Sequence, residues 1–116
     1  MKNGFEDLKV WQKAHELTLK IYKITKVFPE EEKFRLTNQI CRSASSVPTN
    51  IVEGRGRYHN KEFKHFLYIA RGSLEETKYH LILSKDLNYI SKQNYEELMD
   101  LSIEIGKMLS GLIKSL

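Results

Sequence analysis

The sequence predicts an all-α fold in which four helices form an antiparallel, up-down-up-down bundle. Apolar residues recur every three or four positions along four separate segments, which is the period of an α-helix with one buried face. The chain contains only 6 Gly and 2 Pro, too few for the turns of a small all-β domain. Its 116 residues are the length of one domain, 1–116, around a single core.

The first predicted helix begins near Val10 and ends before Pro29. Its apolar residues are spaced alternately four and three positions apart, so they share one face over about five turns. They are Val10, Ala14, Leu17, Ile21, Ile24 and Phe28. This face is the expected contribution of the segment to the core.

A second apolar stripe runs from Leu36 toward Gly54, after three glutamates at 30–32 whose charge favours a helix N-terminus. Pro48 interrupts this stripe, and a proline inside a helix removes one backbone hydrogen bond at a cost of about 3 kcal/mol. The helix either kinks at Pro48 or breaks shortly before it. Because the stripe continues in register to Ile51, we expect a kinked but continuous helix.

Two further helices are predicted in the second half of the chain. The segment 54–57 is typical of a helix end followed by a loop, and Asn60 is the expected N-cap of a helix that runs to about Asp86. Ser91 is expected to cap the last helix. The two stripes consist of Phe63, Leu67, Ala70, Leu74, Thr77 and Leu81, and of Leu98, Leu101, Ile105, Met108, Leu112 and Leu116.

Small residues cluster in the second and third predicted helices, at 43–46 and 70–73. Gly72 costs about 1 kcal/mol relative to Ala inside a helix, a cost that is understandable if the glycine lets two backbones approach closely. We therefore expect tight packing between helices at both stretches.

Cys41 has no neighbouring residue that would activate its thiol, so a buried structural role is expected.

Apolar side chains also lie outside the core stripes of the first and third helices. At about 100° per residue, they fall on the sides that a monomeric bundle would expose to water. They are Trp11, Leu19, Tyr22, Tyr68, Tyr79 and Leu83. Scattered exposed tyrosines are common, but aromatics repeated 11 residues apart on two helices favour the subunit interface of a homo-oligomer.

Lysine and arginine form two regular rows, one on the first helix and one that recurs every seven residues on the third. The first row consists of Lys9, Lys13, Lys20 and Lys23. The second consists of Lys64, Arg71, Lys78 and Lys85, with Lys61 one turn before it. Interleaved glutamates make an ordinary solvated surface one interpretation. Since the net charge is +4, the other is a basic surface, shared within an oligomer, that binds the phosphates of RNA or DNA.

No convincing catalytic, metal or cofactor motif is present in the sequence. Glu62 and His65 have the Glu-x-x-His spacing of di-iron bundles, but the motif occurs once and Lys64 lies beside them. The loop at 54–57 lacks the Gly-Lys-Ser/Thr ending of a phosphate-binding loop. Solvated or edge positions are expected for the other histidines, His15, His59 and His80. We therefore expect no enzyme activity, no metal and no cofactor.

The single cysteine cannot form an internal disulfide, and the first residues lack the apolar stretch of a signal peptide. No apolar run approaches the roughly 20 residues that a membrane span requires. We expect a cytoplasmic protein that does not insert into a membrane.

The most distinctive motif is Ser46-Val47-Pro48-Thr49-Asn50-Ile51-Val52-Glu53-Gly54. Further characteristic segments are 5–14, Phe28-Pro29, 36–42, 70–76 and 105–109. Together they resemble the family of 23S rRNA intervening-sequence proteins over nearly the whole chain. The resemblance implies a four-helix bundle that assembles as a homopentamer, similar in shape to the accessory variability determinant of diversity-generating retroelements.

The family's recurrent polar positions fall on Arg42, Asn50, Glu53, Arg71, Ser73 and Glu75. A structural role is expected for them. Asn50 and Glu53 would satisfy backbone groups freed by Pro48. Arg42 or Arg71 would pair with Glu53 or Glu75 between helices.

The resemblance implies no catalytic activity, and the retroelement relative works with a reverse transcriptase and nucleic acid. The expected function is that of a non-enzymatic oligomer that binds nucleic acid through its phosphates. The alternative is a scaffold that binds a protein partner and no nucleic acid.

Overall fold

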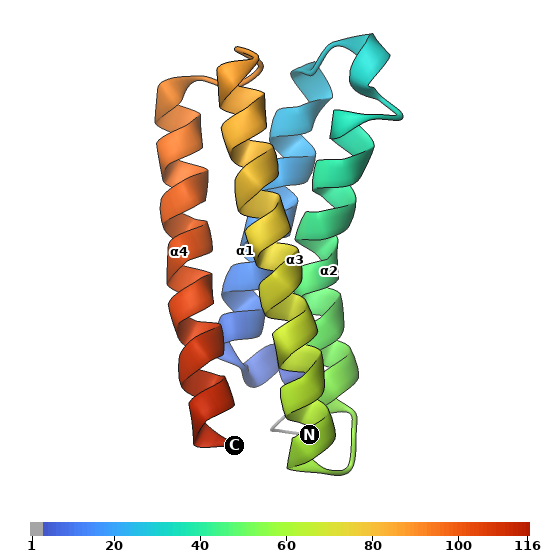
Figure 1. Ribbon diagram of the computed structural model, residues 1–116, viewed down its shortest axis with the longest axis vertical. Helices are drawn as coiled ribbons and strands as arrows, with labels where there is room; N and C mark the ends of the chain where they lie inside the picture. The colour runs from blue at the N-terminus through green and yellow to red at the C-terminus, as the bar shows by residue number, and fades with distance from the viewer. Residues whose placement is uncertain (1–3) are drawn as a thin grey trace.

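The computed structural model describes residues 4–116 and consists of four long helices (Figure 1). They are α1 (Lys9–Ile24), α2 (Leu36–Arg55), α3 (Asn60–Asp86) and α4 (Lys92–Ser115). Consecutive helices run in opposite directions, and the described residues contain no strand. The predicted four-helix bundle is confirmed. Over the described part of the chain, no helix is both long and apolar enough to cross a membrane.

The helices form a four-sided bundle in which α1 and α3 lie at opposite corners. Each of these two helices packs against both α2 and α4, and the most extensive contact joins α2 to α3. The α2–α3 connection lies at the same end of the bundle as the C-terminus, and the α1–α2 and α3–α4 connections lie at the other end (Figure 1). This arrangement places α4 between one flank of α1 and one flank of α3.

The buried faces of α1, α2 and α3 follow the predicted stripes, but that of α4 differs in its second half. Leu98, Leu101 and Ile105 are buried as expected, whereas Met108 and Leu112 are half-buried and their neighbours Leu109 and Ile113 lie in the core. All of these residues fall on one broad face at about 100° per residue. The packing of α1 and α3 against α4 decides which of them are covered.

Helix α2 continues through Pro48, as predicted. Because proline has no N–H, the carbonyl of Ala44 loses its donor within the helix. The Thr18 hydroxyl reaches it from α1, with Oγ1 at 3.1 Å from the Ala44 oxygen and 2.9 Å from the Ala14 oxygen. Asn50 does not compensate for Pro48, contrary to expectation. Its Nδ2 donates at 2.8 Å to the Ser46 carbonyl, which is not the carbonyl that Pro48 leaves without a donor. The compensation comes from a neighbouring helix instead.

The segments before α2 and α4 supply caps. Ser91 caps α4 as predicted, since its Oγ accepts from the Asn94 N–H at 3.0 Å. Glu32 Oε1 accepts from the Leu36 N–H at 3.2 Å, at the N-terminus of α2, and its Oε2 accepts from the Tyr89 hydroxyl at 2.8 Å. The Tyr89 hydrogen bond, together with the Leu36 N–H, holds the pKa of the Glu32 carboxyl below its usual value.

The prediction for the N-cap of α3 is wrong. Asn60 is already the first helical residue, and His59 is the N-cap with extended backbone angles (φ −111°, ψ 146°) and no side-chain capping bond.

Helices α2 and α3 approach each other closely at Gly54. A Cβ atom there would lie 2.8 Å from Phe66 Cβ and 2.9 Å from Phe63 Cδ1, whereas a Cβ at Gly72 would meet nothing within 4 Å. The interpretation of Gly72 as a packing glycine is therefore wrong. Gly72 faces solvent on α3, and Gly54 belongs to α2 itself.

Hydroxyl groups line the middle of the α2–α3 contact and confirm the tight packing expected around 43–46. Ser46 Oγ lies 2.9 Å from Ser73 Oγ, and Ser43 Oγ lies 2.8 Å from Thr77 Oγ1. Ser43 Oγ also lies 3.3 Å from His80 Nδ1. We call the four hydroxyl-bearing side chains, Ser43, Ser46, Ser73 and Thr77, the hydroxyl ladder. His80 is 4% exposed, so the expectation of a solvated or edge position is wrong for this histidine.

We predict that Thr18→Val destabilises the protein by about 1–3 kcal/mol, because it leaves the buried Ala44 carbonyl without a donor. Urea unfolding followed by circular dichroism measures this change. Thr49→Val is the matched control, since the exposed Thr49 hydroxyl bonds only to the Ser45 carbonyl of its own helix. Equal effects of the two substitutions would contradict the role of Thr18.

Opposite effects are predicted for alanine at two glycines inside helices. Gly54→Ala should destabilise by about 1–3 kcal/mol, because the added methyl overlaps the Phe63 and Phe66 side chains. Gly72→Ala should stabilise by about 0.5–1 kcal/mol, because it gains helix propensity without a clash. Thermal unfolding of both variants tests the pair, and a stabilising Gly54→Ala would refute the close approach.

Stability should also fall when His80 is protonated. Burial lowers the pKa of His80 below its ordinary value of 6.5, and the nearby Glu76 carboxylate partly opposes this shift. The unfolded chain therefore binds the proton more readily, so this contribution is complete above about pH 6.5 and is lost as the pH falls toward the lower folded-state pKa. Urea unfolding between pH 7.5 and about 5 should show this loss. In His80→Gln the free energy of unfolding should fall less steeply with decreasing pH. An unchanged slope would contradict the assignment to His80.

Candidate nucleic-acid interface

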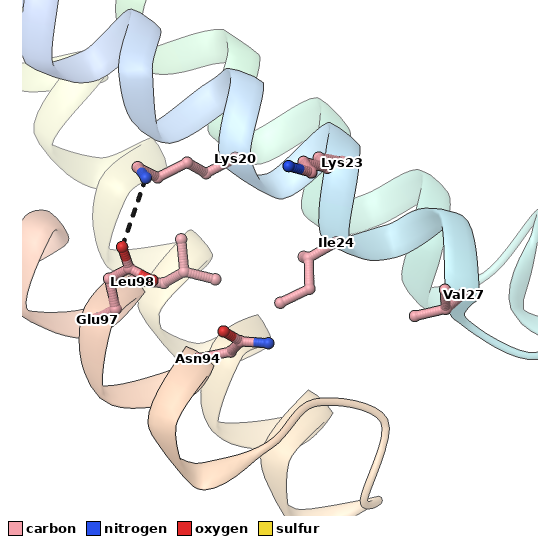
Figure 2. A pocket seen from close by; sticks show the side chains of 7 residues that line it. All are labelled: Lys20, Lys23, Ile24, Val27, Asn94, Glu97 and Leu98. Atoms are coloured by element: carbon pink, nitrogen blue, oxygen red, sulfur yellow. Dashed lines mark hydrogen bonds and ion pairs between the residues drawn. The ribbon is translucent and has the colours of Figure 1, made fainter.

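The basic row on α1 (Lys9, Lys13, Lys20 and Lys23) is partly neutralised by α4. Lys20 Nζ lies 3.4 Å from Glu97 Oε2, and Lys13 Nζ lies 3.9 Å from Glu104 Oε2. Figure 2 shows Lys20 directed toward Glu97 across a cavity of about 340 Å³ between α1 and α4, which Lys23 also lines. Exposed ion pairs contribute little stability, but these carboxylates would repel a polyanion.

The basic row on α3 faces the other side of α4 and gains cations there. Its residues Arg71 and Lys78 line a groove of about 470 Å³ together with Lys107 and Lys114 of α4. We call this the α3–α4 groove. The other lining residues are Glu75, Ile103, Gly106, Ser110 and Gly111. Four cationic side chains thus face one carboxylate.

Sequence reasoning did not select Lys107 and Lys114. The segment 88–116 has a small net negative charge, and this average does not reveal the two lysines on one face of its helix. Lys107 and Lys114 are seven residues apart, as are Arg71 and Lys78, and this shared spacing could have indicated a second basic row. The fold brings the two pairs together because α3 and α4 are antiparallel neighbours.

Local contacts hold the cations of the α3–α4 groove in place. Arg71 Nη1 donates to Ser110 Oγ at 3.3 Å, and the Arg71 guanidinium lies 5.0 Å from the centre of the Tyr68 ring. Lys78 Nζ lies 2.7 Å from Glu75 Oε2. On the α4 side, Gly106 and Gly111 carry no side chain into the groove, so a bound chain can approach the helix backbone closely.

The first residues of the α3 row lie nearer the α2–α3 connection. Lys61 lines a hollow of about 420 Å³ with Arg57, Glu62, His65 and Phe66. Lys64 is half-buried, seven residues before Arg71. Glu62 and His65 therefore lie among cations, and within residues 4–116 no cluster of three or more His, Cys, Asp or Glu side chains is arranged to hold a metal ion.

The residues predicted to form a subunit interface fall into two groups that differ in exposure. Leu19, Tyr22, Tyr68 and Tyr79 are 57%, 50%, 48% and 58% exposed, respectively. Trp11 and Leu83 pack half-buried against the core, so their expected exposure is wrong.

Each of these two side chains is covered for a different reason. The Phe5 ring meets Trp11 edge-on at 5.0 Å, and the His15 ring stacks on Trp11 at 5.0 Å, so a turn before α1 and a residue on α1 cover the indole. The expected exposure of Leu83 came from projecting an ideal straight helix from Phe63, nearly three heptads away. Because such a projection drifts by about 20° per heptad relative to a bundle, it misplaces Leu83, which packs against the core.

The recurrent polar residues do not form the expected pairs between helices. Glu53 pairs with Arg57 of its own helix at 3.5 Å, and Glu75 pairs with Lys78. Each glutamate thus reaches a cation about one turn along its own helix. Arg42 is exposed and lines a shallow polar hollow of about 290 Å³ beside Ser46 and Ser73.

The single cysteine and the two remaining histidines lie outside the α3–α4 groove. Cys41 is half-buried against the core, and its Sγ lies 3.5 Å from Thr25 Oγ1. His15 and His59 are exposed, as expected.

The geometry defines an antiparallel four-helix bundle with a basic groove between its last two helices. The chain belongs to the 23S rRNA-intervening sequence protein family, whose model matches residues 6–111. A solved structure from Bacteroides thetaiotaomicron, described as a protein with unknown function from the S23 ribosomal protein family, is 34% identical. The match covers 90% of this chain and 95% of that one, with a TM-score of 0.84. No curated protein matches the chain.

Proposed function

We propose that this protein is a non-enzymatic, cytoplasmic scaffold that binds nucleic acid through backbone phosphates in the α3–α4 groove. The observation that carries the proposal is the convergence of Arg71, Lys78, Lys107 and Lys114 around one carboxylate, Glu75. Phosphate contacts by Lys and Arg give affinity without reading sequence.

The contrast between the two sides of α4 supports the choice of this groove. On the α1 side, Glu97 and Glu104 lie within 4 Å of the lysine ammonium groups of Lys20 and Lys13. On the α3 side, Lys107 and Lys114 add charge to the row instead of removing it. A polyanion is therefore attracted to the α3–α4 groove more strongly than to the α1 row.

We further propose that the chain assembles as a homopentamer, as the resemblance of its sequence implies. The exposed pairs Leu19 with Tyr22 and Tyr68 with Tyr79 lie on helices at opposite corners of the bundle. Two different patches on opposite sides suit a head-to-tail interface, the kind that closes into a ring. A ring would multiply the basic grooves and raise the avidity for a long nucleic acid.

Neutralising the groove should weaken nucleic-acid binding and its salt dependence together. We predict that Lys107→Gln with Lys114→Gln lowers the slope of log affinity against log salt by about 0.7 per lost contact with a single strand, or about 0.9 with a duplex. Lys13→Gln with Lys20→Gln is the matched control and should change the slope less. Fluorescence anisotropy with labelled RNA, single-stranded DNA and duplex DNA at several salt concentrations measures both.

The mass of the same samples in solution completes the experiment. A pentamer has five times the 13.7 kDa of one chain, and each variant should keep the mass of the parent. An equal loss of binding in both double variants would refute the choice of groove. An intact oligomer that binds no nucleic acid at low salt would refute the proposal and favour the scaffold for a protein partner.

A further inference from the structure

The α2–α3 connection presents an aromatic ring to solvent. Tyr58 is 91% exposed, more than any other large apolar or aromatic side chain among residues 4–116. The neighbouring His59 ring meets it edge-on, with 4.7 Å between the ring centres. This T-shaped contact orients the tyrosine ring, and at 91% exposure most of the ring surface stays accessible.

Two basic residues lie close to Tyr58 in the sequence. Arg57 and Lys61 flank it in the sequence and line the hollow at the start of α3. The Arg57 guanidinium lies 4.7 Å from the centre of the Phe66 ring and 3.5 Å from a Glu53 oxygen, so it is held close to the connection. Exposed aromatics beside cations are the combination that binds single-stranded nucleic acid, because bases stack on the rings while phosphates meet the charges.

A second exposed aromatic lies at the other end of the bundle, in a segment that carries more carboxylates. Phe34 is 83% exposed in the α1–α2 connection, at the opposite end from Tyr58 (Figure 1). It follows three glutamates at 30–32 and has Lys33 5.6 Å from the centre of its ring. Phe34 is nearly as exposed as Tyr58. It is flanked by Lys33 and Arg35, but the three glutamates leave the segment 30–35 with a net negative charge.

Helix α3 carries a further basic residue between the α2–α3 connection and the α3–α4 groove. Lys64 lies between Lys61 and Arg71 on α3, seven residues before the arginine. The last turns of α4, which carry Lys114, reach the same end of the bundle as the α2–α3 connection (Figure 1). At a rise of 1.5 Å per residue, Lys61 to Lys78 spans about 25 Å of α3.

We infer that the partner is a single-stranded nucleic acid whose backbone follows the α3–α4 groove toward Lys61 while one base stacks on Tyr58. This inference rests on the proposed function and adds the strandedness of the ligand. A duplex keeps its bases stacked inside the helix and has none to offer to a protruding ring, whereas a single strand does.

The test compares Tyr58→Ala, Tyr58→Phe and Phe34→Ala. Probes are oligo(U) RNA and oligo(dT) DNA of about 20 nucleotides, long enough for one binding site, and a duplex DNA of similar length. Tyr58→Ala should weaken single-strand binding about tenfold and leave the salt slope unchanged, because no charge is removed. Tyr58→Phe keeps the ring and should bind like the parent. Phe34→Ala removes a ring of similar exposure from the other end of the bundle and should have no effect.

The outcomes separate this inference from the proposed function. If Tyr58→Ala leaves single-strand affinity unchanged while the Lys107 and Lys114 substitutions reduce it, the stacking inference is overturned and the groove stands. Equal losses on duplex and single strand also overturn it. Absence of binding to every probe overturns the proposed function and the inference with it.

Crosslinking provides a further test of the inference. Photo-crosslinking of 5-iodouridine in the RNA should map to Tyr58. Comparison of oligo(U) with oligo(dT) identifies the strand chemistry, since contacts to the 2′-hydroxyl favour RNA.

Discussion

The close contact between α2 and α3 is the constraint on which the arrangement of this bundle depends. The missing side chain at Gly54 lets the two helices approach at one end, and the hydroxyl ladder continues the contact through the middle with side chains small enough to keep the helices near each other. With one flank of α3 committed to α2, the opposite flank, which carries Arg71 and Lys78, is directed toward α4. The position of the basic groove thus follows from packing on the other side of the same helix.

Pro48 shows how the bundle accommodates a local defect at the helix that makes this contact. A proline within α2 frees the Ala44 carbonyl, which is buried where water cannot reach it. The Thr18 hydroxyl of α1 supplies a donor, so the defect is compensated between helices. The bond also ties α1 to α2 in register, since a shift of one residue would remove the hydroxyl from the carbonyl.

Charge on this protein is organised by α4. Its carboxylates at 97 and 104 meet the lysines of α1, and its lysines at 107 and 114 join the cations of α3. The acidic segment before Phe34 and the basic segment around Tyr58 extend this asymmetry to the two ends of the bundle.

The sequence by itself determined the number of helices, most of their core faces, the cap at Ser91 and the continuity of α2 through Pro48, because these depend on periodicity and on groups close together in the chain. The tertiary structure decided what depends on a neighbouring helix. Burial of His80, the close approach at Gly54 and the donor for Ala44 all require the α2 contacts to be known. The same holds for the two basic rows, which look alike in the sequence. Only the packing of α4 shows that one meets carboxylates and the other meets Lys107 and Lys114, because the field at a side chain is the sum over every helix that faces it.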